Sequence, residues 1–188
     1  MFVNPPFSSP VISPASQDIF SGDAATTITL TGLPTGGNCG GSYSYFWQTS
    51  TDGVTYTDNG TNGNVPFSPG AITSTKHYRI RIVCGSETAF SNPAVVNVYQ
   101  HLATPAITPS VLTITFNTSP SFSIGSATGG KCGGLYTYTW KTSTDNITFT
   151  DFTGFLGNLT TTTYVKRIVT CGTRSEEHTS ELQSQNRI

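Results

Sequence analysis

Charged side chains are scarce in this sequence. Asp, Glu, Lys and Arg make up only 10% of its 188 residues, whereas a typical soluble domain has about 25%. The formal net charge is −1 and no stretch is rich in lysine or arginine, so the chain lacks the clustered cations with which proteins neutralise nucleic-acid phosphates. We therefore expect no nucleic acid among its partners.

Long apolar segments are also absent. No run of apolar residues approaches the roughly 20 that a membrane helix requires, and no cationic amphipathic helix offers a contact with a membrane surface. Residues 1–7 contain neither the basic nor the apolar region of a signal peptide. The sequence thus predicts no membrane insertion and indicates an internal fragment of a longer protein.

Residues that perform catalysis are few and do not group. The three histidines, His77, His101 and His178, belong to no Ser/His/Asp or Cys/His pattern that recurs in the chain. No pair of carboxylates lies in an apolar stretch that would raise a pKa, and no glycine-rich loop has a phosphate-binding spacing. We expect a protein that is not an enzyme and that needs no cofactor.

What the sequence does contain is a repeat. Residues 39–58 return 93 positions later as residues 132–151, and both copies begin with Cys-Gly-Gly. A period near 90 residues has the size of a small domain and exceeds that of a solenoid unit. The predicted divisions are an N-terminal linker or fragment end at 1–9, a first repeat at 10–100, a linker at 101–104 and a second repeat at 105–173.

The repeats have the pattern of an all-β protein. Apolar or aromatic residues alternate with hydroxyl residues, which is typical of half-buried strands, and Gly- or Pro-containing turns separate these stretches. Seven short strands in about 90 residues favour tandem immunoglobulin-like or PKD-like β-sandwich domains. In the first repeat we expect strands near 11–20, 25–32, 42–50, 54–58, 65–72, 76–83 and 89–99.

The C-terminal stretch differs in composition from the rest of the chain. Residues 174–184 read as the translation of a common sequencing-library adapter, and they hold three of the four glutamates. We interpret residues 174–188 as such a segment, outside the fold; a genuine helical tail is the alternative. On this interpretation the second repeat is truncated before its last strand, which leaves a sheet edge unpaired.

Each repeat contains two cysteines at equivalent places. Cys39 and Cys132 precede the aromatic strands, whereas Cys84 and Cys171 end the strand near 76–83 and its counterpart. Because these strands are antiparallel neighbours in the predicted fold, we expect the disulfides Cys39–Cys84 and Cys132–Cys171. Free buried thiols or a zinc site are the alternatives, and the Cys-Gly-Gly spacing does not suit zinc. Disulfides imply an oxidising, extracellular or cell-surface location.

Each repeat also carries a row of three aromatic residues at alternate positions. Alternate residues share one face of a strand, and the opposite face is mostly polar, so we expect the row to face the core. Stacking on sugar rings, as in carbohydrate-binding modules, is the alternative. The rows are Tyr43, Tyr45 and Trp47 in the first repeat and Tyr136, Tyr138 and Trp140 in the second.

Two pairs of aspartates recur, Asp52 with Asp58 and Asp145 with Asp151. Asp52 and Asp145, each with the residue that follows, are expected to close a hairpin, because aspartate in a turn forms local hydrogen bonds. A calcium ion needs six or more oxygen ligands, and only two side chains are identifiable in each repeat. We predict no metal site and keep these four residues as weak calcium candidates.

The order of these motifs resembles a known kind of repeat. Tyr-x-Tyr-x-Trp-x-x-Ser-x-Asp-Gly, a Pro-Gly turn and Tyr-x-x-Arg-x-Val-x-Cys-Gly are similar to Ig-like or PKD-like modules of large secreted or surface proteins of Gram-negative gliding-type bacteria. The resemblance implies adhesin-like proteins exported by the type IX route. Between Tyr78 and Cys84 the first repeat has one residue fewer than the second has between Tyr164 and Cys171, which predicts a β-bulge.

The resemblance and the lack of a catalytic pattern together predict a function. We expect a non-catalytic spacer and scaffold module of a large extracellular bacterial protein, with adhesive loops as a further role. The rival hypothesis is an accessory carbohydrate-binding module of a secreted enzyme. Expected partners are neighbouring domains of the same chain and, for adhesive loops, a glycan or a surface protein.

Overall fold

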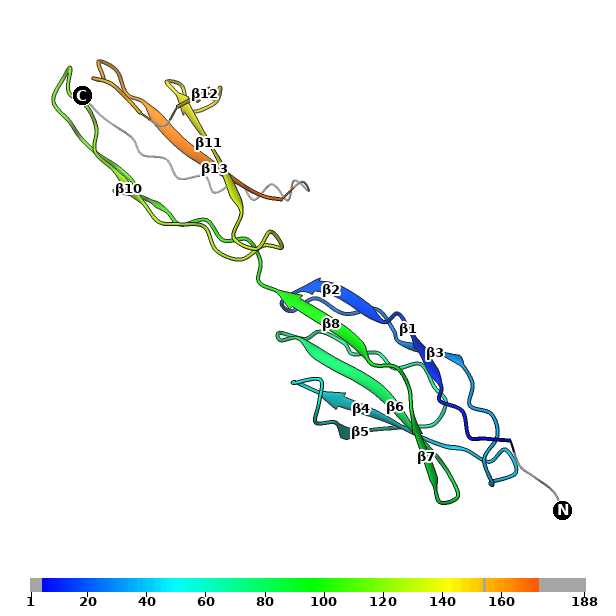
Figure 1. Ribbon diagram of the computed structural model, residues 1–188. Helices are drawn as coiled ribbons and strands as arrows, with labels where there is room; N and C mark the ends of the chain where they lie inside the picture. Colours follow the sequence, from blue (N-terminus) through cyan, green and yellow to red (C-terminus); the bar gives the residue numbers. More distant parts are fainter. Residues whose placement is uncertain (1–4, 154, 173–188) are drawn as a thin grey trace. The chain divides into compact units, whose positions relative to one another are not determined.

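The computed structural model describes residues 5–153 and 155–172, and it is all-β (Figure 1). The chain divides into two compact units, Met1–Tyr99 and Gln100–Ile188, which we call the first and the second domain. Strands, turns and irregular segments make up the described residues. No helix among them is long and apolar enough to cross a membrane.

The first domain is a sandwich of two sheets. In the larger sheet the strands lie in the order β2-β8-β6-β4-β5, and β7 also pairs with β6. The smaller sheet pairs β1 (Val11–Ser13) with β3 (Thr29–Gly32). The strands of the larger sheet are β2 (Ser16–Phe20), β4 (Ser44–Ser50), β5 (Thr57–Asn62), β6 (Lys76–Cys84), β7 (Glu87–Phe90) and β8 (Ala94–Tyr99).

Proline divides two of the predicted strands. The strand expected near 11–20 is interrupted at Pro14, so that β1 pairs with β3 in one sheet while β2 runs parallel to β8 in the other. The strand expected near 89–99 is interrupted at Pro93 into β7 and β8. Proline has no backbone N–H and therefore breaks a ladder of hydrogen bonds. At the second break, the Asn92 side chain bonds both the N–H and the C=O of Ile12 at 2.8 and 3.1 Å.

Two other expectations need correction. The strand expected near 65–72 is reduced to isolated bridges at Phe67 and Ala71, because Pro66 and Pro69 prevent a continuous ladder. The strand expected near 54–58 lies instead at β5, residues 57–62. The turn that begins at Asp52 is longer than a two-residue hairpin loop and displaces the returning strand.

The core of the first domain lies between the sheets, centred on Trp47 of β4 and on Ile80 and Ile82 of β6. Trp47 is 0% exposed, and its indole N–H donates to the carbonyl oxygen of Val65 at 3.0 Å. Burying an indole requires such a partner for its N–H. The alternation of the sequence therefore sets which face of β4 and β6 points inward.

The second domain repeats part of this plan. A small sheet pairs β9 with β10, and a larger sheet has the order β12-β11-β13. A bridge between Thr118 and Leu159 lies near the place of the bridge between Ala24 and Ala71 in the first domain, counted from the matched cysteines. The strands are β9 (Ile107–Thr108), β10 (Ser123–Ile124), β11 (Tyr136–Ser143), β12 (Thr150–Phe152) and β13 (Tyr164–Cys171).

Only Gly172 follows β13 among the described residues. The stretch interpreted as a translated adapter, residues 174–188, lies outside the described residues. Among the described residues, β13 therefore pairs with β11 alone.

Each domain begins earlier than the sequence predicts. The carbonyl oxygen of Pro5 accepts a bond from the N–H of Gly37 at 3.0 Å, and that of Gln100 accepts one from Gly130 at 2.8 Å. Leu102, placed in the predicted linker at 101–104, is buried against Ala127 and Val169. Residues 5–9 and 100–104 thus belong to the domains that follow them, since their backbone and side chains complete the core.

The predicted β-bulge is absent. Ser44 pairs with Val83, and Thr137 pairs with Thr170, in ladders that run without a register shift. Counting back from Cys84 and Cys171, Ile80 corresponds to Arg167. The prediction was wrong because it aligned the two tyrosines, Tyr78 and Tyr164, whereas the strands align from their cysteine ends.

Candidate functional site

The disulfides join the cysteines that the sequence pairs. Cys39 is bonded to Cys84 with a Cα–Cα distance of 5.2 Å, and Cys132 is bonded to Cys171 at 5.3 Å, both within the usual range. A glycine two residues before the first cysteine makes room for each bond. A Cβ on Gly37 would lie 2.6 Å from the sulfur of Cys84, and Gly37 has a φ of 78°, so only glycine fits this position.

The aromatic row faces the core in the first domain. Trp47 is fully buried, and the Tyr43 hydroxyl donates to the carbonyl oxygen of Gly36 at 2.9 Å. A buried indole offers no face for a sugar ring. The first domain therefore has the core arrangement that the alternation favours.

The same row is less covered in the second domain. The Tyr136 hydroxyl donates to Gly129 at 2.7 Å, as its counterpart does, but Tyr138 is 41% exposed and Trp140 is only half-buried. Arg167 lies over Tyr138, 4.6 Å from the ring centroid. Of the two aromatic rows, the one in the second domain therefore has the exposed ring, Tyr138.

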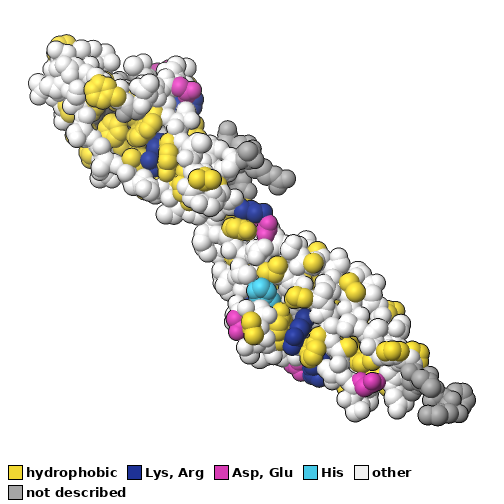
Figure 2. Space-filling view, viewed as in Figure 1, with side chains coloured by type: hydrophobic (Ala, Val, Ile, Leu, Met, Phe, Trp, Pro, Cys, Tyr) yellow, Lys and Arg dark blue, Asp and Glu magenta, His cyan; other side chains and the backbone are white. Residues whose placement is uncertain are grey.

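The outer face of the first domain's larger sheet carries a cluster that the sequence analysis treated only as polar. The guanidinium of Arg79 lies between the rings of Tyr56 and Phe90, 4.0 and 4.1 Å from their centroids, and that of Arg81 lies 4.3 Å from the ring of Phe46. On this face Figure 2 shows Lys and Arg side chains set between hydrophobic ones. Cation–π contacts of this kind hold long side chains in place.

Hydrogen bonds join the two arginines to one carboxylate. Arg81 donates to Asp58 at 2.8 Å, Arg79 donates to Gln48 at 2.8 Å, and Gln48 donates to Asp58 at 2.8 Å. The bond from Gln48 and then that from Arg81 lower the pKa of Asp58 below its usual value. We call Phe46, Gln48, Tyr56, Asp58, Arg79, Arg81 and Phe90 the outer-face cluster.

The second domain keeps a simpler version of this cluster. Lys166, the counterpart of Arg79, lies 4.0 Å from the ring centroid of Phe149, and Lys141 forms an ion pair with Asp151. Arginines that recur at alternate positions opposite aromatic residues are the sequence signal that could have predicted the cluster. The outer-face cluster holds two arginines and one carboxylate, and each of these charged groups has a hydrogen-bond or ring partner within it, so the cluster stabilises the sheet surface.

The recurring aspartates serve two different purposes. Asp52 accepts bonds from the N–H groups of Val54 and Thr55, both at 2.8 Å, and from the Ser50 hydroxyl. These bonds, that from Val54 first, hold the pKa of Asp52 well below its usual value. Asp58 belongs to the outer-face cluster instead.

Asp145 repeats the turn of Asp52 in the second domain. The Ser143 hydroxyl and the N–H groups of Ile147 and Thr148 donate to it, and they lower its pKa to about 2. Asp151 pairs with Lys141. Within each domain the two calcium candidates thus make separate sets of bonds, and among the described residues no three His, Cys, Asp or Glu side chains group as a metal site.

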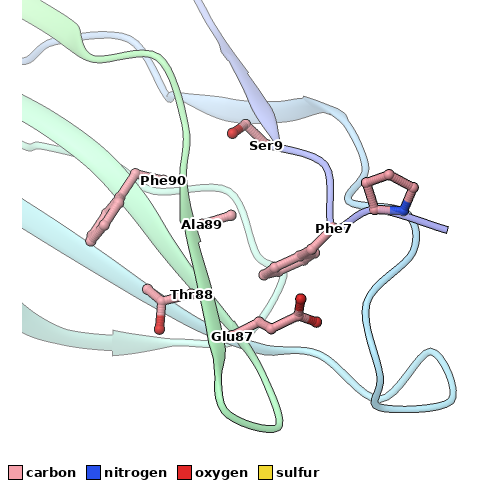
Figure 3. A pocket seen from close by; sticks show the side chains of 7 residues that line it. Phe7, Ser9, Glu87, Thr88, Ala89 and Phe90 are labelled. Carbon is pink, nitrogen blue, oxygen red and sulfur yellow. The ribbon is translucent and has the colours of Figure 1, made fainter. Parts of the chain in front are cut away.

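A shallow groove lies beside β7 in the first domain (Figure 3). Phe7 and Ala89 face it, whereas the ring of Phe90 turns to the other side of β7. Glu87 contributes the one ionisable side chain of the lining and accepts a bond from the N–H of Asn38 at 3.1 Å. The groove therefore holds no pair of acid and base.

Comparison with known proteins relates the first domain to a family whose description states no function. A family model described as a domain of unknown function (DUF8696) matches residues 10–100. A solved structure of the three N-terminal domains of the Highly Immunogenic Outer Capsid protein (Hoc) of bacteriophage RB49 is similar over 95% of this chain and 68% of that chain, with 12% identity and a TM-score of 0.47. No curated protein matches the chain.

Proposed function

We infer that this chain is a non-catalytic, force-bearing spacer of a large extracellular protein. The observation that carries the proposal is the parallel pairing of β2, which follows the short strand β1, with β8, the last strand of the first domain. Five residue pairs, from Ser16 with Val95 to Phe20 with Tyr99, make up this ladder.

The parallel pairing of β2 with β8 resists tension because of the direction of the two strands. A force that pulls the two chain ends apart draws β2 and β8 along each other in opposite directions. The hydrogen bonds between them, which lie across the strands, are then loaded together and not one after another. The side-chain bond from Asn97 to Asp18 at 2.8 Å adds to the same junction.

The disulfides limit how far such a spacer can lengthen. Cys39 and Cys84 are 45 positions apart, and an extended residue spans about 3.4 Å. The bond therefore withholds about 150 Å of chain when the first domain opens. It also supports an oxidising location, which we propose to be the exterior or the surface of a bacterial cell.

The role as a spacer agrees with the chemistry of the described side chains. Each charged side chain of the outer-face cluster has a hydrogen-bond or ring partner within the cluster, and the turn aspartates bond the backbone. We propose that the chain has no enzymatic activity and no cofactor, and that its main partners are neighbouring domains. The exposed Val54 and Ile147, 81% and 84% exposed at equivalent turns, are candidates for adhesive contacts.

The experiment is force spectroscopy on the full chain held by its ends. We expect a high-force rupture from the first domain and a weaker one from the second. Val95→Pro removes the bond from the Val95 N–H to the Ala15 carbonyl oxygen, which is worth about 1 kcal/mol, and should lower the high rupture force. Asp58→Asn, remote from β2 and β8, is the control and should leave it unchanged.

A uniform low-force rupture, or equal effects of the two substitutions, would count against the proposal. An increase of about 150 Å in the unfolding length of the first domain on reduction would identify that domain in the traces. Reduction also tests whether the disulfide sets the limit to extension.

The alternative function, a carbohydrate-binding module, is favoured by one observation, the 41% exposure of Tyr138. Its test is a glycan array with the full chain and with Tyr138→Ala. Binding that Tyr138→Ala removes while the protein stays folded would support the alternative. We expect no binding by either protein, since Arg167 already lies over this ring.

A further inference from the structure

The guanidinium of Arg79 is held on both faces and at its Nε within the outer-face cluster. It lies between the rings of Tyr56 and Phe90, 4.0 and 4.1 Å from their centroids. Its Nε donates to the side-chain oxygen of Gln48 at 2.8 Å. Contacts of this kind fix a long side chain before a ligand arrives. Arg79 therefore loses little side-chain freedom on binding, and such ordering is one of the costs of recognition.

The terminal nitrogens of this guanidinium are available to a ligand. Of the five N–H donors of an arginine, only the one on Nε has a hydrogen-bond partner for Arg79 among the described residues. Both oxygens of Asp58 are already occupied, since they accept bonds from Gln48 and Arg81 at 2.8 Å. Arg79 is only half-buried, so its terminal nitrogens reach solvent. Within the cluster, Arg79 is thus a positive charge without an acidic partner.

The free edge of the guanidinium has the shape of a carboxylate site. The two terminal nitrogens of an arginine form a planar fork that bonds both oxygens of a carboxylate. Because Nε is committed to Gln48, this end-on approach to Arg79 is the one left open. The edge of an aromatic ring carries partial positive charge, and the fork lies between two rings. An anion at the fork is therefore favoured by the arginine and by its aromatic neighbours.

The second domain shows that this arrangement exceeds what the sheet surface needs. Lys166 stands at the position of Arg79 and lies 4.0 Å from the ring centroid of Phe149. The residue paired with it is Lys141, where the first domain has Gln48. One lysine over one ring covers the sheet there. The fork, its second ring and its glutamine partner belong to the first domain and point to a role beyond packing.

The charge and the position of the fork define the ligand. The chain has no stretch rich in lysine or arginine, so a single carboxylate suits the site better than a polyanion does. The fork lies on the face of the sheet, where β6 is paired on both sides, so the main chain of a partner finds no free strand edge there. The site therefore recognises a side chain. Arginine, tyrosine and phenylalanine are also enriched in protein–protein interfaces.

We propose that Arg79, between Tyr56 and Phe90, binds the side-chain carboxylate of an Asp or Glu residue on a partner polypeptide. An apolar residue beside that carboxylate packs on the ring of Phe90, which is 40% exposed and turns away from the groove beside β7 (Figure 3). This inference is independent of the proposed role as a spacer, because it uses the outer face of the sheet and not the pairing of β2 with β8.

The test is an NMR titration of the isotope-labelled full chain with two short peptides. The probes are acetyl-Leu-Glu-Leu-amide and acetyl-Leu-Gln-Leu-amide, which differ in charge and have nearly the same size. The Glu peptide should shift the Nε–H signal of Arg79 and the ring signals of Tyr56 and Phe90, with a Kd in the millimolar range of a single contact. The Gln peptide should bind about tenfold more weakly, because it lacks the charge-assisted bonds. Equal affinities, or no shift of these signals at about 50 mM Glu peptide, would overturn the proposal.

Two substitutions separate the fork from the general charge of the surface. Arg79→Lys keeps the charge and introduces the residue type that the second domain has at this position, but it removes the fork. The Glu peptide should then bind about tenfold more weakly. Arg81→Lys is the matched control and should leave the affinity unchanged, because Arg81 bonds Asp58. The amide spectrum reports whether each variant is folded, and equal losses in the two variants would refute the assignment of Arg79.

Two further measurements identify the kind of ligand. Lys166 and Phe149 provide an internal control, since a lysine has no planar fork, and their signals should move little with the Glu peptide. Shifts and affinities at Lys166 that equal those at Arg79 would mean that any exposed cation suffices, and would overturn the site. Glucuronic acid, titrated in the same way, presents a carboxylate on a sugar ring. Tighter binding of glucuronic acid than of the Glu peptide would overturn the assignment to a polypeptide.

Discussion

The two domains share a sequence pattern but differ in how completely they enclose their aromatic row. Trp47 is 0% exposed, and its strand lies in a sheet whose central strand β6 is paired on both sides. Trp140 occupies the same position but is half-buried, and β13 has one neighbour among the described residues. Alternation decides which face turns inward, whereas the neighbouring strands decide how far that face is buried.

The two domains also differ in the residue at the middle of β6 and of its counterpart β13. Ile80 is fully buried in the first domain, and Arg167 takes its place in the second. Burial lowers the pKa of Arg167, because desolvation disfavours its charged form. Its terminal nitrogen donates to the carbonyl oxygen of Gly125 at 2.9 Å, so the guanidinium has a partner in its buried place.

The largest expected effect is that of removing the two tryptophans. Trp47→Ala should destabilise the first domain by about 3–5 kcal/mol, since it leaves a cavity in a closed core. Trp140→Ala should cost the second domain roughly half as much, because its side chain is only half-buried. Denaturant titration followed by hydrogen exchange at β6 and β13 separates the two domains.

Equal losses of unfolding free energy in the two domains would contradict the expected difference between Trp47 and Trp140. They would mean that Trp140 is as well enclosed as Trp47 in solution. The pair Tyr43→Phe and Tyr136→Phe is the matched control, because both hydroxyls donate to a glycine carbonyl oxygen. These substitutions should cost the two domains about the same, roughly 1 kcal/mol.

Removing the disulfides should have nearly equal effects. The bonds join positions that are 45 and 39 apart, and loop entropy grows only slowly with length. Replacing both cysteines of a pair by alanine should therefore cost each domain about 4 kcal/mol in the chain-entropy model. Thermal unfolding of the two double variants measures this. A much smaller loss in the second domain would show that its unfolded state is already restricted.

Local patterns account for what the sequence predicts well. Period-2 alternation predicts the strands and the inward face of the aromatic row, and the matched cysteines predict the disulfides. The sequence did not predict the strand breaks at Pro14 and Pro93, because they depend on which sheet each half of the strand joins. The strand near 65–72 is likewise reduced to bridges, because Pro66 and Pro69 have no N–H to donate.

The outer-face cluster and Arg167 were not predictable from single strands. The contacts of Arg79 join β5, β6 and β7, and a strand taken alone does not tell which aromatic residues lie opposite. An alignment of Tyr78 with Tyr164 sets Arg167 at the position of Arg81, which lies on the outer face. Counting from the cysteines, which are fixed by their disulfides, gives the correct register and moves Arg167 into the core.

The smallest expected effect is a pH dependence of the turn at Asp145. Its pKa is about 2 in the folded domain and about 3.9 in an unfolded chain. A depressed pKa favours the folded state above about pH 4, and this contribution disappears as the pH falls through about 2. Denaturant unfolding of the second domain should therefore show that the advantage of the parent chain over Asp145→Asn shrinks between pH 5 and pH 2.

The first domain sharpens this test, because Asp52 makes the same bonds with a pKa held lower still. Its contribution should persist to a lower pH than that of Asp145. Ser143→Ala removes the bond that lowers the Asp145 pKa most and should move the carboxyl titration, followed by NMR, upward toward its unfolded value. A titration of Asp145 near pH 4 in the parent chain would mean that the turn does not hold its hydrogen bonds in solution.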